Sequence, residues 1–186
     1  MQVVRSMDTA TRTPEGGAQM TKPLKEGAFT VRNDSIEHYL ADMSKQKLWW
    51  VYDFVAKHGR LFGDCRPLPK GCMQGQPKAC FWNAYLLSSL RIELIYVEGF
   101  ARRAIGDTDF ITHHAWTVDQ KGHVYDPTWK GIEYFGIPFK PEYAQRTMKR
   151  IMPTCLSLLD NSVEKFPLKR SKSSRVWILP MTFKCE

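Results

Sequence analysis

The stretch that decides the fold is residues 93–126, ELIYVEGFARRAIGDTDFITHHAWTVDQKGHVYD. Three β-rich runs follow one another in it: 93–101, 111–119 and 123–126. A polar loop at 106–109 separates the first two runs, and a turn at 120–122 separates the second from the third. Strands joined by such short connections pair as antiparallel neighbours. The stretch therefore predicts an antiparallel β-sheet.

Helical patterns flank this predicted sheet. An apolar periodicity predicts one long helix from Asp34, the start of a capping box, to Gly59. Pro77 fits the first turn of a second helix over 78–90, and a third is expected over 141–152. The inward-facing residues of the second helix are expected to be Trp82, Tyr85, Leu86 and Leu90. The order of elements predicts an α+β domain with helices packed on an antiparallel β-sheet.

The size and composition set limits on the class of protein. The chain has 186 residues, of which 43% are hydrophobic, so we expect a flexible N-terminal tail at 1–29 and one domain at 30–186. This composition excludes a wholly disordered chain. No run approaches the roughly 18 apolar residues that a membrane-spanning helix needs. Since the first residues also lack a secretory pattern, we expect a cytoplasmic protein with no membrane partner.

The net charge of +8 is unevenly distributed. Residues 81–140 carry six basic and seven acidic groups, whereas 41–80 and 141–186 carry excesses of +4 and +5. The densest basic run, from Lys169 to Arg175, is typical of a solvated, solubilising segment. A basic surface also steers acidic partners towards a protein. We therefore expect an acidic protein or peptide partner.

The chain has five cysteines, an odd number, and no Cys-x-x-Cys pair. An odd count in a chain without a secretory leader favours free thiols over a disulfide framework. Cys72 and Cys80 lie eight residues apart, which is wider than the paired spacing of structural zinc sites. We therefore expect neither a metal nor a cofactor.

Cys80, His114 and Asp126 together suit thiol chemistry. A nucleophilic thiol must lose its proton, which a helix N-terminus and a neighbouring imidazole both favour. Cys80 lies in the first turn of a predicted helix, His114 on a predicted strand, and Asp126 at the end of the next strand. Adjacent antiparallel strands can bring His114 beside Asp126, whose carboxylate would orient the imidazole. The three residues are thus candidates for one catalytic site.

The same region resembles a known family. Cys80, Tyr96-Val-Glu-Gly-Phe-Ala101, His114-Ala-Trp116 and Val124-Tyr-Asp-Pro-Thr-Trp129 are similar to the transglutaminase-like core, within the papain-like group of cysteine enzymes. The resemblance covers about residues 72–140. It implies a Cys-His-Asp triad at Cys80, His114 and Asp126, with the cysteine on a helix packed against an antiparallel sheet.

Other residues near these motifs are secondary candidates. His113 is the rival of His114, but neighbours on a strand point to opposite faces, and the match to His-Ala-Trp selects His114. His113 would then line the rim of a cleft or be solvated. The candidates for oxyanion stabilisation or substrate binding are Gln74, Gln76, Trp116 and Trp129. Their alternatives are solvated loop glutamines and buried packing tryptophans.

These observations predict an acyl-transfer enzyme, either a cysteine protease or amidase or a transglutaminase-like acyltransferase. Its thiol would act on an amide through a thioester, with hydrolysis slightly favoured over transfer to an amine. One alternative is a catalytically silent binding or inhibitory module on the same fold. The other is a basic nucleic-acid-binding protein, which is less favoured because basic and aromatic residues are not interleaved in one compact segment.

Overall fold

The computed structural model describes residues 35–106, 108–152, 157–171, 173 and 177–180. Its sheet contains β1 (Arg60–Phe62), β2 (Ile95–Ile105), β3 (Thr108–Val118), β4 (Val124–Tyr125) and β5 (Glu133–Pro138). Its helices are α1 (Ile36–Lys45), α2 (Trp50–His58), α3 (Cys80–Leu90), α4 (Pro141–Ile151) and α5 (Pro167–Arg170). The expected tail at 1–29, Cys155, Cys185 and parts of the basic run lie outside the described residues.

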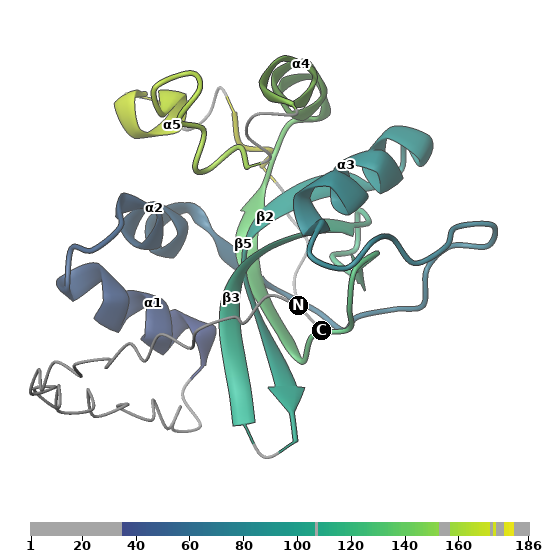
Figure 1. Ribbon diagram of the computed structural model, residues 1–186, viewed down its shortest axis with the longest axis horizontal. Coiled ribbons are helices and arrows are strands. Elements are labelled where there is room, and N and C mark those ends of the chain that lie inside the picture. Colours follow the sequence, from purple (N-terminus) through teal and green to yellow (C-terminus); the bar gives the residue numbers. More distant parts are fainter. Residues whose placement is uncertain (1–34, 107, 153–156, 172, 174–176, 181–186) are drawn as a thin grey trace, which may run out of the picture.

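The antiparallel sheet is confirmed, and with it the α+β class. β2 and β3 form a hairpin in which Gly99 lies opposite His114, and β4 pairs with the end of β3. The turn after β3 closes because Gly122 adopts a φ of 85° and the Asp119 side chain accepts hydrogen bonds from the backbone of Lys121 and His123. The expected strands are thus present, with β2 and β3 each extending further into the connecting loop (Figure 1).

The sheet is not a simple meander, because its strand order is β1-β5-β2-β3-β4. The sequence analysis assigned no strand to β5, which lies between β1 and β2. Glycine is required where β2 and β5 cross the large ring of Trp116. A Cβ on Gly136 would lie 2.6 Å from that ring, and a Cβ on Gly99 would overlap the backbone of Phe135. These two glycines let the strands pair closely behind the tryptophan.

The prediction of one long helix from Asp34 to Gly59 is wrong. The chain forms α1 and α2, separated by a turn in which Lys47 has a φ of 54°. The N-cap of α1 is Ser35, whose hydroxyl accepts the His38 amide at 3.4 Å. Because the helix is broken, both α1 and α2 can bury apolar residues against the same face of the sheet. One straight helix of this length would extend beyond that face.

The second helix begins later than predicted. Lys78 has a φ of 63°, Ala79 is the N-cap, and Cys80 is the first residue of α3. Tyr85 is buried as expected, but Leu86 and Leu90 are 38% and 76% exposed. Because α3 is apolar on almost every side, its sequence does not reveal which face is buried. α4 occupies the region predicted for the third helix.

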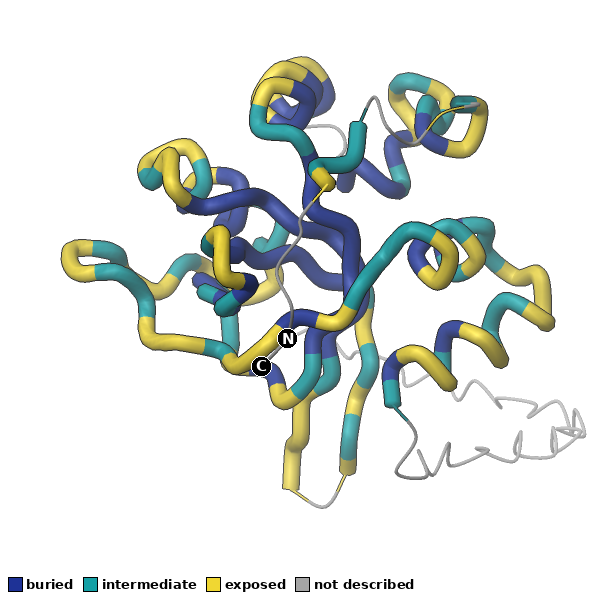
Figure 2. The backbone as a smooth tube through the Cα atoms, turned by 180° about the vertical axis from the view of Figure 1, so that it is seen from behind, coloured by how far each residue is buried: buried dark blue, intermediate teal, exposed yellow. Residues whose placement is uncertain are grey.

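The two faces of the sheet are covered differently. All five helices contribute to a core with Tyr96, Phe100 and Ala115 on one face. The other face carries a smaller cluster around Val97 and Trp116, covered by segments outside the helices. Figure 2 shows the buried sheet within a more exposed periphery. Among the described helices, none has the length and apolarity needed to cross a membrane.

Candidate active site

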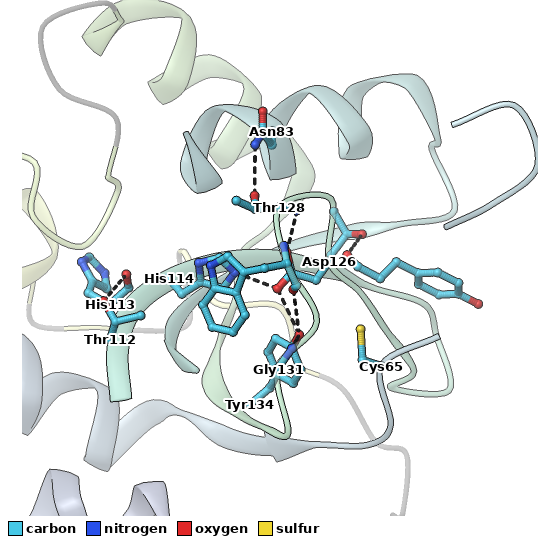
Figure 3. Close-up of polar contacts among 12 residues, drawn as sticks. Cys65, Asn83, Thr112, His113, His114, Asp126, Thr128, Gly131 and Tyr134 are labelled. Carbon is cyan, nitrogen blue, oxygen red and sulfur yellow. Dashed lines mark hydrogen bonds and ion pairs between the residues drawn. The ribbon is translucent and has the colours of Figure 1, made fainter. Parts of the chain in front are cut away.

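His114 and Asp126 form a buried pair on the face of the sheet opposite the helices. His114 Nε2 lies 2.7 Å from Asp126 Oδ2, and their side chains are 1% and 0% exposed (Figure 3). β3 carries the histidine, and the aspartate follows β4, which pairs with β3. The strand pairing therefore brings together two side chains that are twelve residues apart.

Four hydrogen bonds fix the Asp126 carboxylate. Oδ1 accepts the backbone N–H groups of Thr128 at 2.8 Å and Trp129 at 3.2 Å. Oδ2 accepts the Tyr134 hydroxyl at 3.0 Å in addition to His114. A carboxylate with this many donors has little freedom to rotate away from the imidazole. Its orientation is thus set by the loop that follows it and by β5.

Tyr134 is a site residue that the sequence analysis missed. Its side chain is almost completely buried on β5, and its oxygen accepts the Gly131 amide at 2.5 Å while donating to Asp126. Its pKa is raised far above the usual value by burial first and then by the Asp126 charge. It therefore stays a neutral donor. Tyr134 reaches Asp126 only because β5 pairs with β2. No short sequence motif encodes that pairing, so the sequence analysis missed this residue.

Cys80 approaches His114 from the N-terminus of α3. β4 pairs only with Thr117 and Val118, so among the described residues no strand lies beside His114 on that side of β3. There the Cys80 thiol lies close enough to the His114 ring to raise the pKa of His114. Because Nε2 is bonded to Asp126, Nδ1 is the ring nitrogen left for an interaction with the thiol. The structure thus brings Cys80, His114 and Asp126 together in the order that a catalytic triad requires.

The environment of His114 favours its protonated form. Burial lowers the pKa of His114, but the hydrogen bonds and charges of Asp126 and Cys80 outweigh burial and raise the pKa to about 9. An imidazolium is therefore stable beside the half-buried Cys80 at neutral pH.

Two tryptophan rings pack near the His114 imidazole, and they differ in how far they are buried. The Trp129 ring stacks on His114 with centroids 4.1 Å apart and planes 27° apart, and Trp129 is half-buried. The guanidinium of Arg103 lies 5.6 Å from the centre of the same indole. Trp116, in contrast, is completely buried and contributes packing under the site. Of the two candidate tryptophans, Trp129 is the one available to a substrate.

The loop before α3 is tied to the rest of the site by Asn83. The Asn83 amide accepts the Gln76 N–H at 3.2 Å, donates to the Gln76 carbonyl at 2.7 Å and donates to Thr128 at 3.0 Å (Figure 3). Gly75 N–H donates to the carbonyl of Pro127 at 2.6 Å. The backbone beside Cys80 is thus fixed to the loop that holds Asp126.

The side chains of Gln74 and Gln76 are exposed. No hydrogen bond joins either side-chain amide to another of the described residues. The free N–H groups in the first turn of α3 lie next to the thiol, because the first amides of a helix have no intrahelical acceptor. These amides are therefore candidate hydrogen-bond donors to a group bound beside Cys80, and Gln74 and Gln76 remain candidates too.

His113 points to the opposite face from His114 (Figure 3). Its ring lies between Trp49, Phe81 and Phe100, with centroid distances of 5.1, 4.9 and 5.6 Å. Burial first, and then the charge of His114, lower the pKa of His113 to about 3. The expectation that His113 lines a cleft rim or is solvated is therefore wrong. It is a neutral packing residue next to the site.

A buried carboxylate, Glu98, lies beside His113 and was also missed. Its oxygens accept hydrogen bonds from the Tyr96 hydroxyl at 2.6 Å, the Ser157 hydroxyl at 2.9 Å, and the amides of Leu158 and Leu159 at 2.6 and 3.0 Å. Burial raises the pKa of Glu98 despite these donors. Because three of these four donors come from a segment 59 to 61 residues away, Glu98 fastens the C-terminal part of the fold to β2.

No three His, Cys, Asp or Glu side chains of the described ranges cluster in a way that could hold a metal ion. A scan against protein-family models found no match to the chain, and searches of curated proteins and of solved structures found none.

Proposed function

We propose that the protein is a thiol-dependent acyl-transfer enzyme with Cys80 as nucleophile, His114 as general acid and base, and Asp126 as the group that orients His114. The observation that carries the proposal is the buried 2.7 Å contact of His114 Nε2 with Asp126, with the Cys80 thiol close enough to the same ring to raise the pKa of His114. The resemblance of residues 72–140 to the transglutaminase-like core supports the same assignment.

The reaction proceeds through a thioester. The Cys80 thiolate attacks an amide carbonyl carbon, and the oxyanion that forms accepts hydrogen bonds from the first amides of α3. The His114 imidazolium then protonates the leaving amine as its C–N bond breaks. In the second half, neutral His114 takes a proton from water or from an acceptor amine, which attacks the thioester and releases the thiolate. Water gives an amidase or protease, and an amine gives a transferase.

Water is the acceptor that we favour. The substrate class is an amide of a protein or peptide, either in the backbone or in a glutamine side chain. Incubation with a fluorescent primary amine and candidate proteins distinguishes the two outcomes, because only a transferase incorporates the label. Loss of the starting amide without incorporation identifies a hydrolase.

The assignment of the nucleophile is tested by labelling with a carbonyl-directed thiol probe. We expect one cysteine to react much faster than the others, and peptide mapping by mass spectrometry to place the label on Cys80. Cys80→Ala should abolish the fast phase and His114→Ala should slow it strongly. Cys72→Ala is the matched control, because Cys72 is a half-buried free thiol that also lies beside a cation, at 3.4 Å from Arg91 Nε. Equal labelling of all cysteines, or fast labelling that survives Cys80→Ala, would show that the assignment is wrong.

A further inference from the structure

One edge of the sheet is open next to the candidate site. β4 pairs only with Thr117 and Val118, and within the described ranges no strand pairs with the earlier part of β3 on that side. There β2 and β3 project from the body of the protein as a two-stranded arm (Figure 1). Most of this arm is exposed (Figure 2). An open edge of this kind can pair with another chain.

Alternate residues of β3 direct their backbone groups to this open edge. The N–H of Asp119 donates to the carbonyl of His123 at 3.1 Å, so the backbone of Asp119 faces the β4 side. In an antiparallel strand, residues two apart face the same way. On β2 the carbonyl of Tyr96 accepts the Phe139 amide, on the side away from β3, which agrees with this alternation. We count back from Asp119 in steps of two along β3. The residues reached, whose N–H and C=O groups face the open edge, include His113, Ile111 and Asp109.

The open edge of β3 ends close to the Cys80 thiol. His113 directly precedes His114, whose ring is near the Cys80 thiol at the N-terminus of α3. A strand added to a sheet lies about 4.8 Å from its neighbour. A chain paired with residues 109–113 would therefore continue past the N-terminus of α3, where an amide carbonyl could meet Cys80.

The side chains next to this edge can bind those of an extended chain. Arg103 lies opposite Phe110 and Ile105 lies opposite Thr108, so Arg103, Ile105 and Phe110 share the face that carries His114. Ile105 and Phe110 are 54% and 50% exposed. Arg103 is exposed and contacts Trp129. This strip is apolar with one cation, which suits apolar and acidic side chains.

We propose that the β3 edge at residues 109–113 binds an extended stretch of polypeptide as an added strand, and that this pairing delivers substrate to Cys80. The role in substrate delivery rests on the proposed function. The partner is an unfolded or extended protein segment, because only such a segment offers unpaired backbone groups to the edge. Main-chain hydrogen bonds supply most of the affinity, and the strip of Arg103, Ile105 and Phe110 adds a preference for apolar and acidic residues.

Binding is measured without turnover in the Cys80→Ala protein, by fluorescence anisotropy with fluorescein-labelled casein that has been reduced and alkylated. Ile111→Pro removes an edge-facing N–H and leaves the bonds between β3 and β2 in place. Ile111→Val is the matched control that keeps this N–H. We expect Ile111→Pro to weaken binding about fivefold or more relative to Ile111→Val, as the loss of one backbone hydrogen bond of about 1 kcal/mol implies. Binding should persist in 0.5 M salt.

A change in the ligand tests the same pairing without altering the protein. A decapeptide that the Cys80→Ala protein selects from a casein digest is compared with two forms, each N-methylated at one of the two sets of alternate amides. We expect one form to lose binding and the other to keep it, because only one edge of the added strand faces β3. Equal binding of both forms, equal binding by Ile111→Pro and Ile111→Val, or an absence of binding to casein would overturn the strand-addition proposal. These binding results are independent of Cys80 labelling, which alone decides the assignment of the nucleophile.

Discussion

At the scale of single residues, the site depends on hydrogen bonds that hold the histidine's partner in place. Asp126 has four donors, of which His114 lies on β3 and Tyr134 lies on β5. The backbone donors of Thr128 and Trp129 belong to the same loop as Asp126, so they move with it. Besides His114 itself, Tyr134 is therefore the donor that fixes the Asp126 loop relative to the body of the sheet.

Tyr134→Phe removes the hydroxyl that donates to Asp126 and leaves the Gly131 amide buried without its acceptor. We expect a loss of about 1–3 kcal/mol in the free energy of unfolding, measured by urea denaturation. We also expect severalfold slower labelling of Cys80, because Asp126 orients His114 less well. Tyr125→Phe is the control, since the half-buried Tyr125 hydroxyl has one hydrogen bond within the described part of the chain, to Asp119 at 3.3 Å. If the two variants lose the same stability, Tyr134 does not have this role.

The two neighbouring histidines are expected to affect stability in opposite pH ranges. The pKa of His114 is raised to about 9, above the ordinary value of 6.5, so its stabilising contribution is complete below pH 6.5 and is lost as the pH rises through 9. The pKa of His113 is lowered to about 3, so the unfolded chain binds the proton more tightly. The contribution of His113 to stability is therefore lost as the pH falls from 6.5 towards 3.

Urea denaturation across pH 4–10 distinguishes the two residues. The wild type should lose up to about 1.4 kcal/mol per pH unit relative to His114→Gln between pH 6.5 and 9. Relative to His113→Phe, which keeps a ring in the aromatic pocket, it should lose a similar amount per unit as the pH falls below 6.5. If the free energy of unfolding changes with pH in the same way in the wild type and both variants, neither histidine has the shifted pKa described.

At the scale of elements, the sequence predicted the sheet better than the helices around it. The β-rich runs and the turn at Gly122 are local signals, and the strands and the turn both occur in the structure. The break between α1 and α2 has no such signal. Leu40 and Val51 are both buried, and eleven residues are close to three helical turns, so the apolar stripe continues across the break. Tertiary packing, which the periodicity does not report, ends the first helix.

The same limit applies to the site. Cys80, His114 and Asp126 could be proposed because each lies in a short motif at the end of an element or on a strand. The residues that hold them could not, because they meet their partners only after the sheet has formed. Asn83 bonds Thr128 across 45 residues, and Glu98 bonds Leu159 across 61. The candidate residues could be named from local sequence, and the contacts that support them could not.

The turn between α1 and α2 gives an element-scale prediction. Lys47 has a φ of 54°, which costs a residue with a Cβ about 1 kcal/mol or more, whereas glycine adopts it freely. Lys47→Gly should therefore leave stability unchanged or raise it by up to about 1 kcal/mol. Lys45→Gly, inside the last turn of α1, should lower it by about 1 kcal/mol. Thermal unfolding of the two variants measures both effects, and equal destabilisation would contradict the left-handed turn.

At the scale of the whole molecule, charge and chemistry are separated along the chain. Residues 81–140, which hold His114 and Asp126 and begin immediately after Cys80, are nearly neutral, and the basic excess lies before and after them. A field produced by such flanking charges acts over the distance of diffusional approach and contributes little to a transition state buried in the sheet. The net charge of +8 should therefore affect how often an acidic substrate arrives, and not how fast Cys80 reacts.

Salt separates these two effects. Screening lengths fall from about 14 Å at 0.05 M salt to about 4 Å at 0.5 M, so steering by the flanking charges should be lost over this range. We expect kcat/KM for an acidic protein substrate to fall severalfold, and kcat to stay within about twofold, because steering acts on association. The rate of Cys80 labelling by iodoacetamide, which is uncharged, should not change and serves as the control. An equal fall in labelling would mean that salt alters the site itself, since the reagent has no charge to be steered. An unchanged kcat/KM would instead assign the basic excess to solubility alone.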